Sequence, residues 1–166
     1  MDVLVRKLET VEVEAAAAFA GSCHEGMEDK YGNPYFEHLE RVADRVREME
    51  FDCVHESALI EDFIITAYLH DVIEDTEAEL WEIETKFGKD IAVAVDLLTR
   101  KKGMAYSEYI EKIRTAAKSD IIDGGKIARV VKLADLFDHL MGPTPCPPRL
   151  IKRYEKSLYS LFGTGH

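Results

Sequence analysis

Apolar residues recur three and four positions apart along nearly the whole chain, which is the spacing that places them on one face of an α-helix. Leu39, Val42, Val46 and Met49 form one such stripe. Strict alternation of apolar and polar residues, which is typical of a half-buried strand, is nearly absent beyond the tetrapeptide at 11–14. The sequence therefore predicts an all-α fold, a single compact bundle of about eight helices.

The length of the chain sets its expected domain organisation. With 166 residues it is long enough for one domain with a buried core and short for two. We expect one domain over residues 1–166. Within it, GPTPCPP at 142–148 is expected to be a proline-rich loop, because its four prolines cannot continue a helix, and 149–162 is expected to be a C-terminal helix.

The composition excludes several classes of protein. Hydrophobic residues make up 46% and charged residues 32%, which is the balance of a globular protein rather than a disordered or membrane-embedded one. No stretch approaches the roughly 20 apolar residues that a membrane span needs, and the first residues lack the apolar core of a signal peptide. We therefore expect a cytoplasmic protein that does not contact membranes.

The net charge limits the partners that the chain can bind. Thirty-two acidic residues against 21 basic ones give a formal charge of −11, which repels long nucleic acids, and no basic stripe compensates for it. A small phosphorylated ligand can still bind, because a bound cation and a few lysines reverse the local field. No feature of the sequence indicates a homo-oligomer.

A strongly apolar helix is expected over residues 57–75, and it ends in the polar sequence HDVIED. On one continuous helix, His70 and Glu74 would form one polar column, and Asp71 and Asp75 the next. Burying these groups without partners is costly, and a divalent cation such as manganese, iron or zinc would compensate for it. The ordinary alternative is a helix that ends in solvent, and these six residues alone favour that alternative.

Two polar residues elsewhere lie among apolar neighbours. His38 immediately precedes the apolar stripe that starts at Leu39, and Asp135 lies within VVKLADLF of a helix expected over about 125–141. Each has an ordinary explanation, a histidine satisfied by the backbone and an ion pair of Asp135 with Lys132. Taken with His70 and Asp71, however, they make a set of four metal ligands from three helices that could converge.

Four sequence blocks in order carry a resemblance to a known family. They are HxGxxxKxGxPYxxH at 24–38, AYLHDVIEDT at 67–76, FGKDIAVAVDLLT at 87–99 and VVKLADLFDHL at 130–140. This order resembles the HD-domain metal-dependent phosphohydrolases over about residues 12–141. Within that family, the chain looks like the alarmone hydrolase domain of RelA/SpoT proteins and the small hydrolases similar to metazoan SpoT homologue 1.

The resemblance implies a fold, a cofactor and a reaction. It implies an HD-domain helical bundle that holds one manganese ion. The implied metal ligands are His38, His70, Asp71 and Asp135. Glu74 and Asp75 match the pair that, in the family, positions and activates the water attacking the 3′ phosphate of guanosine tetra- or pentaphosphate. Pyrophosphate is then released.

The departures from the family gather where the base of the nucleotide would bind. Asp29 replaces an arginine that stacks on guanine, Tyr31 replaces a small polar residue, and His139 takes the position of an asparagine that contacts the nucleotide. Leu136 replaces the arginine after the LAD motif. Because the metal and water residues are complete while these contacts differ, we expect a working hydrolase whose preferred nucleotide need not be a guanosine alarmone.

Five residues are expected to contact the substrate, a small phosphorylated nucleotide. They are Lys30 and Lys132 for phosphate oxygens, Tyr31 and Tyr35 for stacking on a base, and His139. Three alternatives stay open at this stage: a phosphatase on another nucleotide such as the 2′-phosphate of NADPH, a catalytically silent nucleotide sensor, and an ion-pair network without a metal. Neither the native metal nor closure of the 142–148 loop over the site follows from the sequence.

Overall fold

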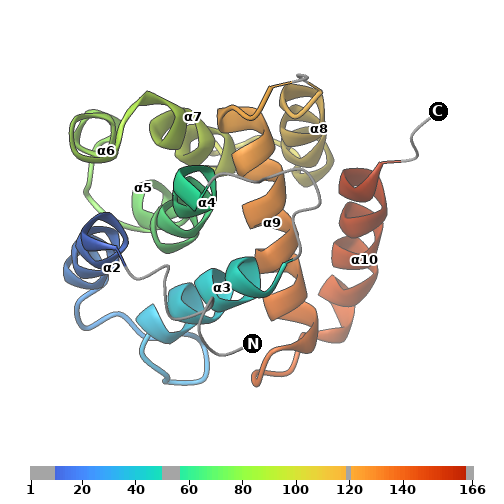
Figure 1. Cartoon of the computed structure of the whole chain (residues 1–166). Helices are drawn as coiled ribbons and strands as arrows, with labels where there is room; N and C mark the ends of the chain where they lie inside the picture. Colours follow the sequence, from blue (N-terminus) through green and yellow to red (C-terminus); the bar gives the residue numbers. More distant parts are fainter. Residues whose placement is uncertain (1–9, 50–56, 119–120, 164–166) are drawn as a thin grey trace.

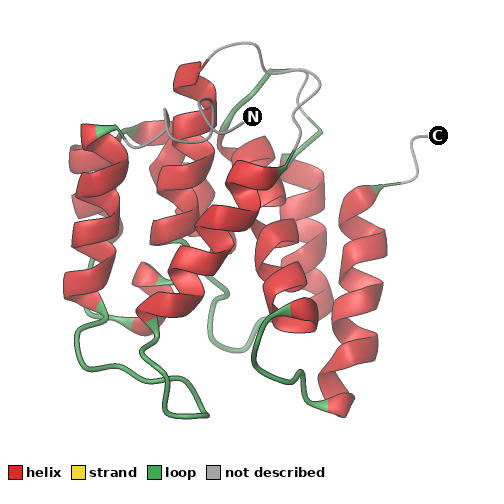
Figure 2. Cartoon of the chain, turned by 60° about the horizontal axis from the view of Figure 1, so that its bottom comes forward, coloured by secondary structure: helices red, strands yellow, loops and turns green. Residues whose placement is uncertain are grey.

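The computed structural model describes residues 10–49, 57–118 and 121–163. In these residues there are eight helices of eight or more residues, one helix of four, and an isolated bridge between Glu28 and Pro34. The helices are α2 (Val11–Cys23), α3 (Phe36–Glu48), α4 (Ser57–Leu69), α5 (Val72–Asp75), α6 (Leu80–Phe87), α7 (Lys89–Leu98), α8 (Tyr106–Ala116), α9 (Gly124–Met141) and α10 (Pro148–Phe162) (Figure 1). The predicted all-α fold is confirmed, and Figure 2 shows these segments as helices joined by loops.

The long helix α9 organises the bundle. It packs against α3, α4, α7, α8 and α10, and α10 follows its outer side in Figure 1. Its side chains Ile127, Val131 and Leu136 are buried in the shared core. Because α9 contacts both α3 and α4, polar residues on that face of α9 come close to the polar ends of the other two helices.

Helix α9 begins with two glycines that allow close helix contacts. A Cβ atom at Gly124 would lie 2.7 Å from Val93 Cγ1 of α7, and one at Gly125 would overlap the carbonyl of Ala116 in α8. Asp123 caps this turn by accepting hydrogen bonds from the backbone N–H groups of Gly125 and Lys126. The close approach fixes where α9 starts, and so fixes the positions of the residues farther along it.

The helix expected over 57–75 is interrupted, so the prediction of one continuous helix is wrong. Helix α4 ends at Leu69 and α5 begins at Val72. Consecutive residues of a regular helix point about 100° apart, because one turn takes 3.6 residues. The break lets His70 and Asp71 turn their side chains to one point, with His70 Nε2 3.0 Å from Asp71 Oδ2.

The start of the last helix differs by one residue from the prediction. Helix α10 begins at Pro148, one residue before the predicted start, because proline suits the first helical turn, and the loop therefore spans 142–147.

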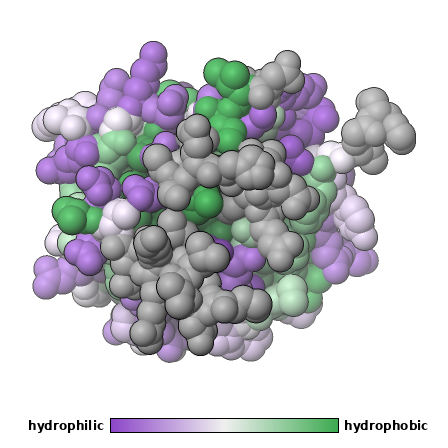
Figure 3. All heavy atoms as spheres, in the orientation of Figure 1, coloured by the Kyte–Doolittle hydropathy of each residue, from purple (hydrophilic) through white to green (hydrophobic). Residues whose placement is uncertain are grey.

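No helix of the described ranges is long and apolar enough to cross a membrane. Hydrophilic residues form much of the periphery in Figure 3. The prediction of one domain over 1–166 includes segments outside the described residues.

Candidate metal centre and substrate pockets

Four of the predicted site residues meet at one point of the bundle. His38 comes from α3, Asp135 from α9, and His70 and Asp71 from the break after α4. The Nε2 atom of His70 lies 3.0 Å from Asp71 Oδ2 and 3.8 Å from Asp135 Oδ1. The Nε2 atom of His38 lies 3.3 Å from Asp135 Oδ1 and 3.7 Å from Asp71 Oδ2. The structure thus brings together all four residues expected as metal ligands.

The two histidines each leave one nitrogen free for an ion. His38 Nδ1 lies 2.9 Å from Asp138 Oδ2, and His70 Nδ1 lies 2.8 Å from the carbonyl oxygen of Ala67. Both partners are acceptors, so Nδ1 carries the proton in each ring. The two Nε2 atoms and Asp135 Oδ1 are buried and have no hydrogen-bond partner. Imidazole nitrogens and carboxylate oxygens that converge in this way fit divalent manganese, iron or zinc.

The charges around the cluster favour bound cations. Asp135 Oδ2 accepts a 2.6 Å hydrogen bond from Lys132 Nζ, the pairing suggested by the sequence, and this leaves Oδ1 for the histidines. Burial raises the pKa of Asp135, but the charges of Lys132 and His139 hold that pKa well below its usual range. Burial lowers the pKa of His38, whereas the negative charges of Asp135 and Asp138 beside the ring stabilise its protonated form and raise the pKa to about 10. Protons and a metal ion therefore compete for the same nitrogens.

Asp138 is a buried member of the site to which the sequence analysis assigned no role. Its Oδ2 pairs with His38 Nδ1 at 2.9 Å, Arg41 Nε donates to both carboxylate oxygens at 3.1 and 3.2 Å, and Arg45 Nε donates to Oδ1 at 3.3 Å. Burial raises its pKa, but the hydrogen bonds from His38 and Arg41 lower it to about 2. The available signal was the spacing on α3, where His38, Arg41 and Arg45 share one face.

We expect Asp138→Asn to weaken divalent-metal binding about tenfold to a hundredfold, the usual effect of altering a carboxylate that orients a liganding histidine. Asparagine keeps the side-chain size but removes the charge that pairs with His38 and Arg41. Isothermal titration with Mn²⁺ measures the change. Asp44→Asn is the matched control, because Asp44 pairs with Arg47 on the same helix and its side chain is 67% exposed. Similar affinities in both variants would contradict this role.

Glu74 and Asp75 lie at the end of α5, next to the cluster. Glu74 Oε2 accepts a 2.7 Å hydrogen bond from the backbone N–H of Arg100. Partial burial is the largest effect raising the pKa of both carboxyl groups, and repulsion from Asp71 adds to it. Asp71 itself accepts a 2.7 Å hydrogen bond from the Tyr35 hydroxyl. Two carboxyl groups with raised pKa values beside a candidate metal centre are suited to proton transfer.

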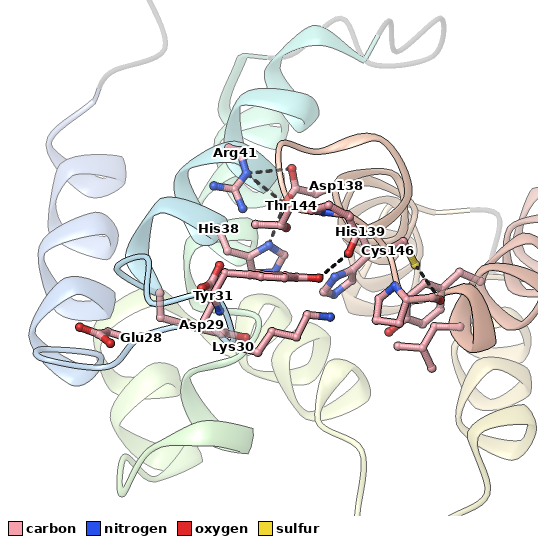
Figure 4. A pocket seen from close by; sticks show the side chains of 15 residues that line it. Glu28, Asp29, Lys30, Tyr31, His38, Arg41, Asp138, His139, Thr144 and Cys146 are labelled. Carbon is pink, nitrogen blue, oxygen red and sulfur yellow. Dashed lines mark hydrogen bonds and ion pairs between the residues drawn. The ribbon is translucent and has the colours of Figure 1, made fainter.

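Two adjoining pockets open onto these groups. The first, called here the carboxylate pocket, has a volume of about 220 Å³ and contains Asp71, Glu74, Asp75 and Asp135 together with Arg100, Lys132 and Arg153. The second, the loop pocket, has a volume of about 280 Å³ and lies between residues 28–31, α3, residues 144–147 and α10 (Figure 4). Because Tyr35, His139 and Tyr154 line both pockets, one ligand can extend from the first into the second.

The residues expected to contact substrate line these pockets. Tyr31 reaches across the loop pocket, where its hydroxyl donates a 2.7 Å hydrogen bond to the carbonyl oxygen of Pro145 (Figure 4). Lys30 Nζ lies 5.0 Å from the centre of the Tyr31 ring. Lys132 and His139 line the carboxylate pocket. The lysines and tyrosines therefore line the two pockets, with Tyr31 at the loop pocket and Lys132 at the carboxylate pocket.

Two positions near the pockets have contacts that their sequence context does not reveal. The Asp29 carboxylate accepts hydrogen bonds from the backbone and side-chain N–H groups of Asn33, so it holds its own loop together. The Tyr35 ring stacks on His24 at 5.2 Å, and its hydroxyl donates to Asp71. One ring face is therefore already covered, and stacking of Tyr35 on a base is limited to the other face.

Comparison with known families identifies the fold. The model of the HD domain matches residues 16–137, which include the four converging side chains and the carboxylate pair of α5. The chain belongs to the HD-domain family. The predicted family resemblance is confirmed, and the family as a whole implies that this HD domain binds a divalent metal.

Two curated relatives show which HD-domain proteins this chain is similar to. Over 130 residues the chain is 33% identical to the guanosine-3′,5′-bis(diphosphate) 3′-pyrophosphohydrolase of Aquifex aeolicus. This alignment covers 78% of this chain and 17% of the relative. Over 123 residues it is 34% identical to the bifunctional (p)ppGpp synthase/hydrolase SpoT of Escherichia coli. This alignment covers 70% of this chain and 16% of the relative. The chain thus spans about a sixth of the length of these curated relatives.

A solved structure is similar over nearly the whole of both chains. It is described as "A metazoan ortholog of SpoT hydrolyzes ppGpp and plays a role in starvation responses". The TM-score is 0.66 at 26% identity, and the alignment covers 93% of this chain and 88% of the other. This match extends beyond residues 16–137 of the family match and supports the all-α architecture described above.

Proposed function

We propose that the chain is a metal-dependent phosphohydrolase that releases pyrophosphate from the 3′ position of a (p)ppGpp-type or related purine nucleotide. The observation that carries the proposal is the convergence of His38, His70, Asp71 and Asp135 beside the carboxylates of α5. The names of the relatives support the substrate class, since the Aquifex protein is named for this reaction and SpoT for hydrolysis of (p)ppGpp.

The four converging residues would hold one divalent ion per chain, and we propose Mn²⁺ for it. When bound, the ion neutralises phosphate charge and lowers the pKa of a water molecule. The protein contributes the orientation of the ligands. Asp138 fixes the His38 ring, the Ala67 carbonyl fixes the His70 ring, and Tyr35 fixes Asp71. Such supporting contacts hold ligands in one geometry before the ion arrives.

Glu74 and Asp75 would carry the proton transfers. In the proposed reaction a water oxygen attacks the phosphorus bonded to the ribose 3′ oxygen, and that bond breaks. Glu74 takes a proton from the water, and the raised pKa of its carboxyl group brings it closer to neutral pH. Asp75, whose pKa is also raised, gives a proton to the departing 3′ oxygen. The products are pyrophosphate and a nucleotide with a free 3′ hydroxyl.

The two pockets fit the two ends of such a substrate. Arg100, Lys132 and Arg153 in the carboxylate pocket supply positive charge for phosphates, in contrast to the net charge of −11 of the chain. Tyr31 and Lys30 in the loop pocket offer an aromatic ring and an ammonium group to the nucleoside. Opposite charge in a confined pocket attracts an anionic ligand even when the protein as a whole repels it.

Helix α10 belongs to the same functional unit in this proposal. It packs on α8 and α9, and its residues Arg153 and Tyr154 line the carboxylate pocket. We therefore propose one domain that includes the proline-rich loop and the C-terminal helix. A cytoplasmic location, expected from the sequence, is part of the same proposal.

A panel of nucleotides read by phosphorus NMR tests the function. The purified protein is incubated with Mn²⁺ and, in separate samples, guanosine and adenosine nucleotides that carry a 3′-diphosphate, and NADPH. We expect pyrophosphate from at least one 3′-pyrophosphorylated nucleotide and none after the metal is removed with EDTA. The panel also reports which base is preferred, because Tyr31 and Asp29 differ from the residues expected in the family.

Three other results would contradict the proposal, and the first two would assign a different function. Inorganic phosphate from NADPH alone would identify a phosphatase of another specificity. Tight nucleotide binding by calorimetry without any product would identify a nucleotide sensor. Absence of bound metal by elemental analysis would leave only the ion-pair network as an explanation of the cluster.

A further inference from the structure

A third histidine lies against the candidate metal centre. His139 is on α9, four residues after Asp135, so the two side chains share one face of the helix. Its Nε2 atom lies 3.1 Å from Asp135 Oδ1, the buried oxygen that has no hydrogen-bond partner. The same oxygen lies 3.3 Å from His38 Nε2 and 3.8 Å from His70 Nε2. Asp135 Oδ1 is therefore surrounded by three imidazole nitrogens.

The His139 ring is held in this position from both sides. It stacks on the His38 ring with centroids 5.1 Å apart and an angle of 29°, and on the Tyr154 ring with centroids 5.3 Å apart and an angle of 27°. Its side chain is nevertheless 44% exposed, because it lines both pockets. The ring is thus oriented by its neighbours and still open to an ion or a ligand that enters from the pockets.

The spacing of these atoms is that of ligands sharing one ion. Bonds of about 2.1 Å from a metal to nitrogen or oxygen put neighbouring ligand atoms roughly 3.0–3.5 Å apart, depending on the coordination geometry. His139 Nε2 and Asp135 Oδ1 meet that spacing, and one ligand atom from each of His38, Asp135 and His139 lies within 4.8 Å of the other two. The same contact is an ion pair when the His139 ring is protonated, so the test must separate a metal ligand from an ion-pair partner.

We propose that His139 is a fifth protein ligand of the metal centre, in addition to His38, His70, Asp71 and Asp135. The inference rests on the metal site of the proposed function. With His139 the ligand set has three imidazoles and two carboxylates, so it is richer in nitrogen than the four-residue set of two imidazoles and two carboxylates. Nitrogen ligands favour the later divalent metals, so His139 raises the affinity for Co²⁺ and Zn²⁺ more than that for Mn²⁺.

Titration with Co²⁺, followed by its visible absorption and by calorimetry, tests the assignment without using activity. We expect His139→Gln to lower the Co²⁺ affinity about tenfold or more, to change the absorption band, and to lower the Mn²⁺ affinity less. Glutamine can still donate a hydrogen bond to Asp135 but is a poor metal ligand, so it separates the two roles. Tyr154→Phe is the matched control, since it keeps the stacked ring and removes no nitrogen.

The outcomes separate this inference from the function on which it rests. If His139→Gln keeps the Co²⁺ affinity and the band of the unmodified protein, His139 is not a ligand and the inference is wrong, while the four-residue centre stands. If the unmodified protein binds neither Co²⁺ nor Mn²⁺, the metal centre itself fails, and the inference fails with it. His70→Ala serves as the reference for loss of a ligand within the four-residue centre, and it should abolish the band.

Discussion

Asp71→Asn should remove nearly all hydrolysis, with kcat/KM lowered by at least about 10³-fold, because a metal centre that loses an anionic ligand loses both its ion and the activation of water. The Oδ2 atom of Asp71 is close to both histidines, at 3.0 Å from His70 Nε2 and 3.7 Å from His38 Nε2. Release of pyrophosphate measures the rate, and elemental analysis measures the metal content.

The control for this variant is a carboxylate outside the cluster. Asp96 on α7 is 46% exposed and lies 3.7 Å from Lys112, so Asp96→Asn should leave the rate and the metal content unchanged. An exposed pair of this kind contributes little to stability. If Asp71→Asn kept its metal and its turnover, the assignment of Asp71 as a ligand would have to be abandoned.

Glu74→Gln should separate metal binding from proton transfer. We expect kcat to fall about 10²- to 10⁴-fold, the range for loss of a general base, with the Mn²⁺ affinity changed little. Glutamine keeps an oxygen for the hydrogen bond from the Arg100 backbone, so the local structure should survive. Steady-state release of pyrophosphate at saturating metal and substrate gives kcat, and calorimetry gives the affinity.

The pH dependence gives a second measure of the same residue. A general base must be ionised, so the rate rises with pH through its pKa. Burial and the neighbouring Asp71 raise the pKa of Glu74, so the acid limb of the profile should lie above the ordinary value of 4.5. That limb should be absent in Glu74→Gln. Glu84→Gln on the exposed surface of α6 should show the unmodified profile, and an unchanged acid limb in Glu74→Gln would assign the limb to another group.

The helical class was predictable because it depends on local spacing. Leu39, Val42 and Val46 are fully buried, as the apolar stripe indicated, while Met49 is only partly buried where α3 has ended. The period of the pattern states which face of a helix turns inward. It does not state how the helices cross, so the meeting of α3, α4 and α9 followed from the family resemblance rather than from periodicity.

The interruption at 70–71 and the role of Asp138 could not be predicted in the same way. No residue of HDVIED is a helix breaker, and the break is associated with contacts made in three dimensions by His70 and Asp71. Asp138 depends on a neighbour from another helix, and its partners Arg41 and Arg45 read in the sequence as surface charges. Tertiary contacts override local preference at these places, and they coincide with the candidate centre.

The hydrogen bond from Tyr31 to Pro145 joins opposite rims of the loop pocket through a main-chain oxygen. That oxygen is present whatever side chain occupies position 145, and the surrounding prolines restrict the backbone that carries it. Side chains such as Thr144 and Cys146, which line the same pocket, can therefore be exchanged without removing either partner of this hydrogen bond. The side chains that this loop offers to a ligand can thus be engineered separately from the backbone contact that ties the loop to Tyr31.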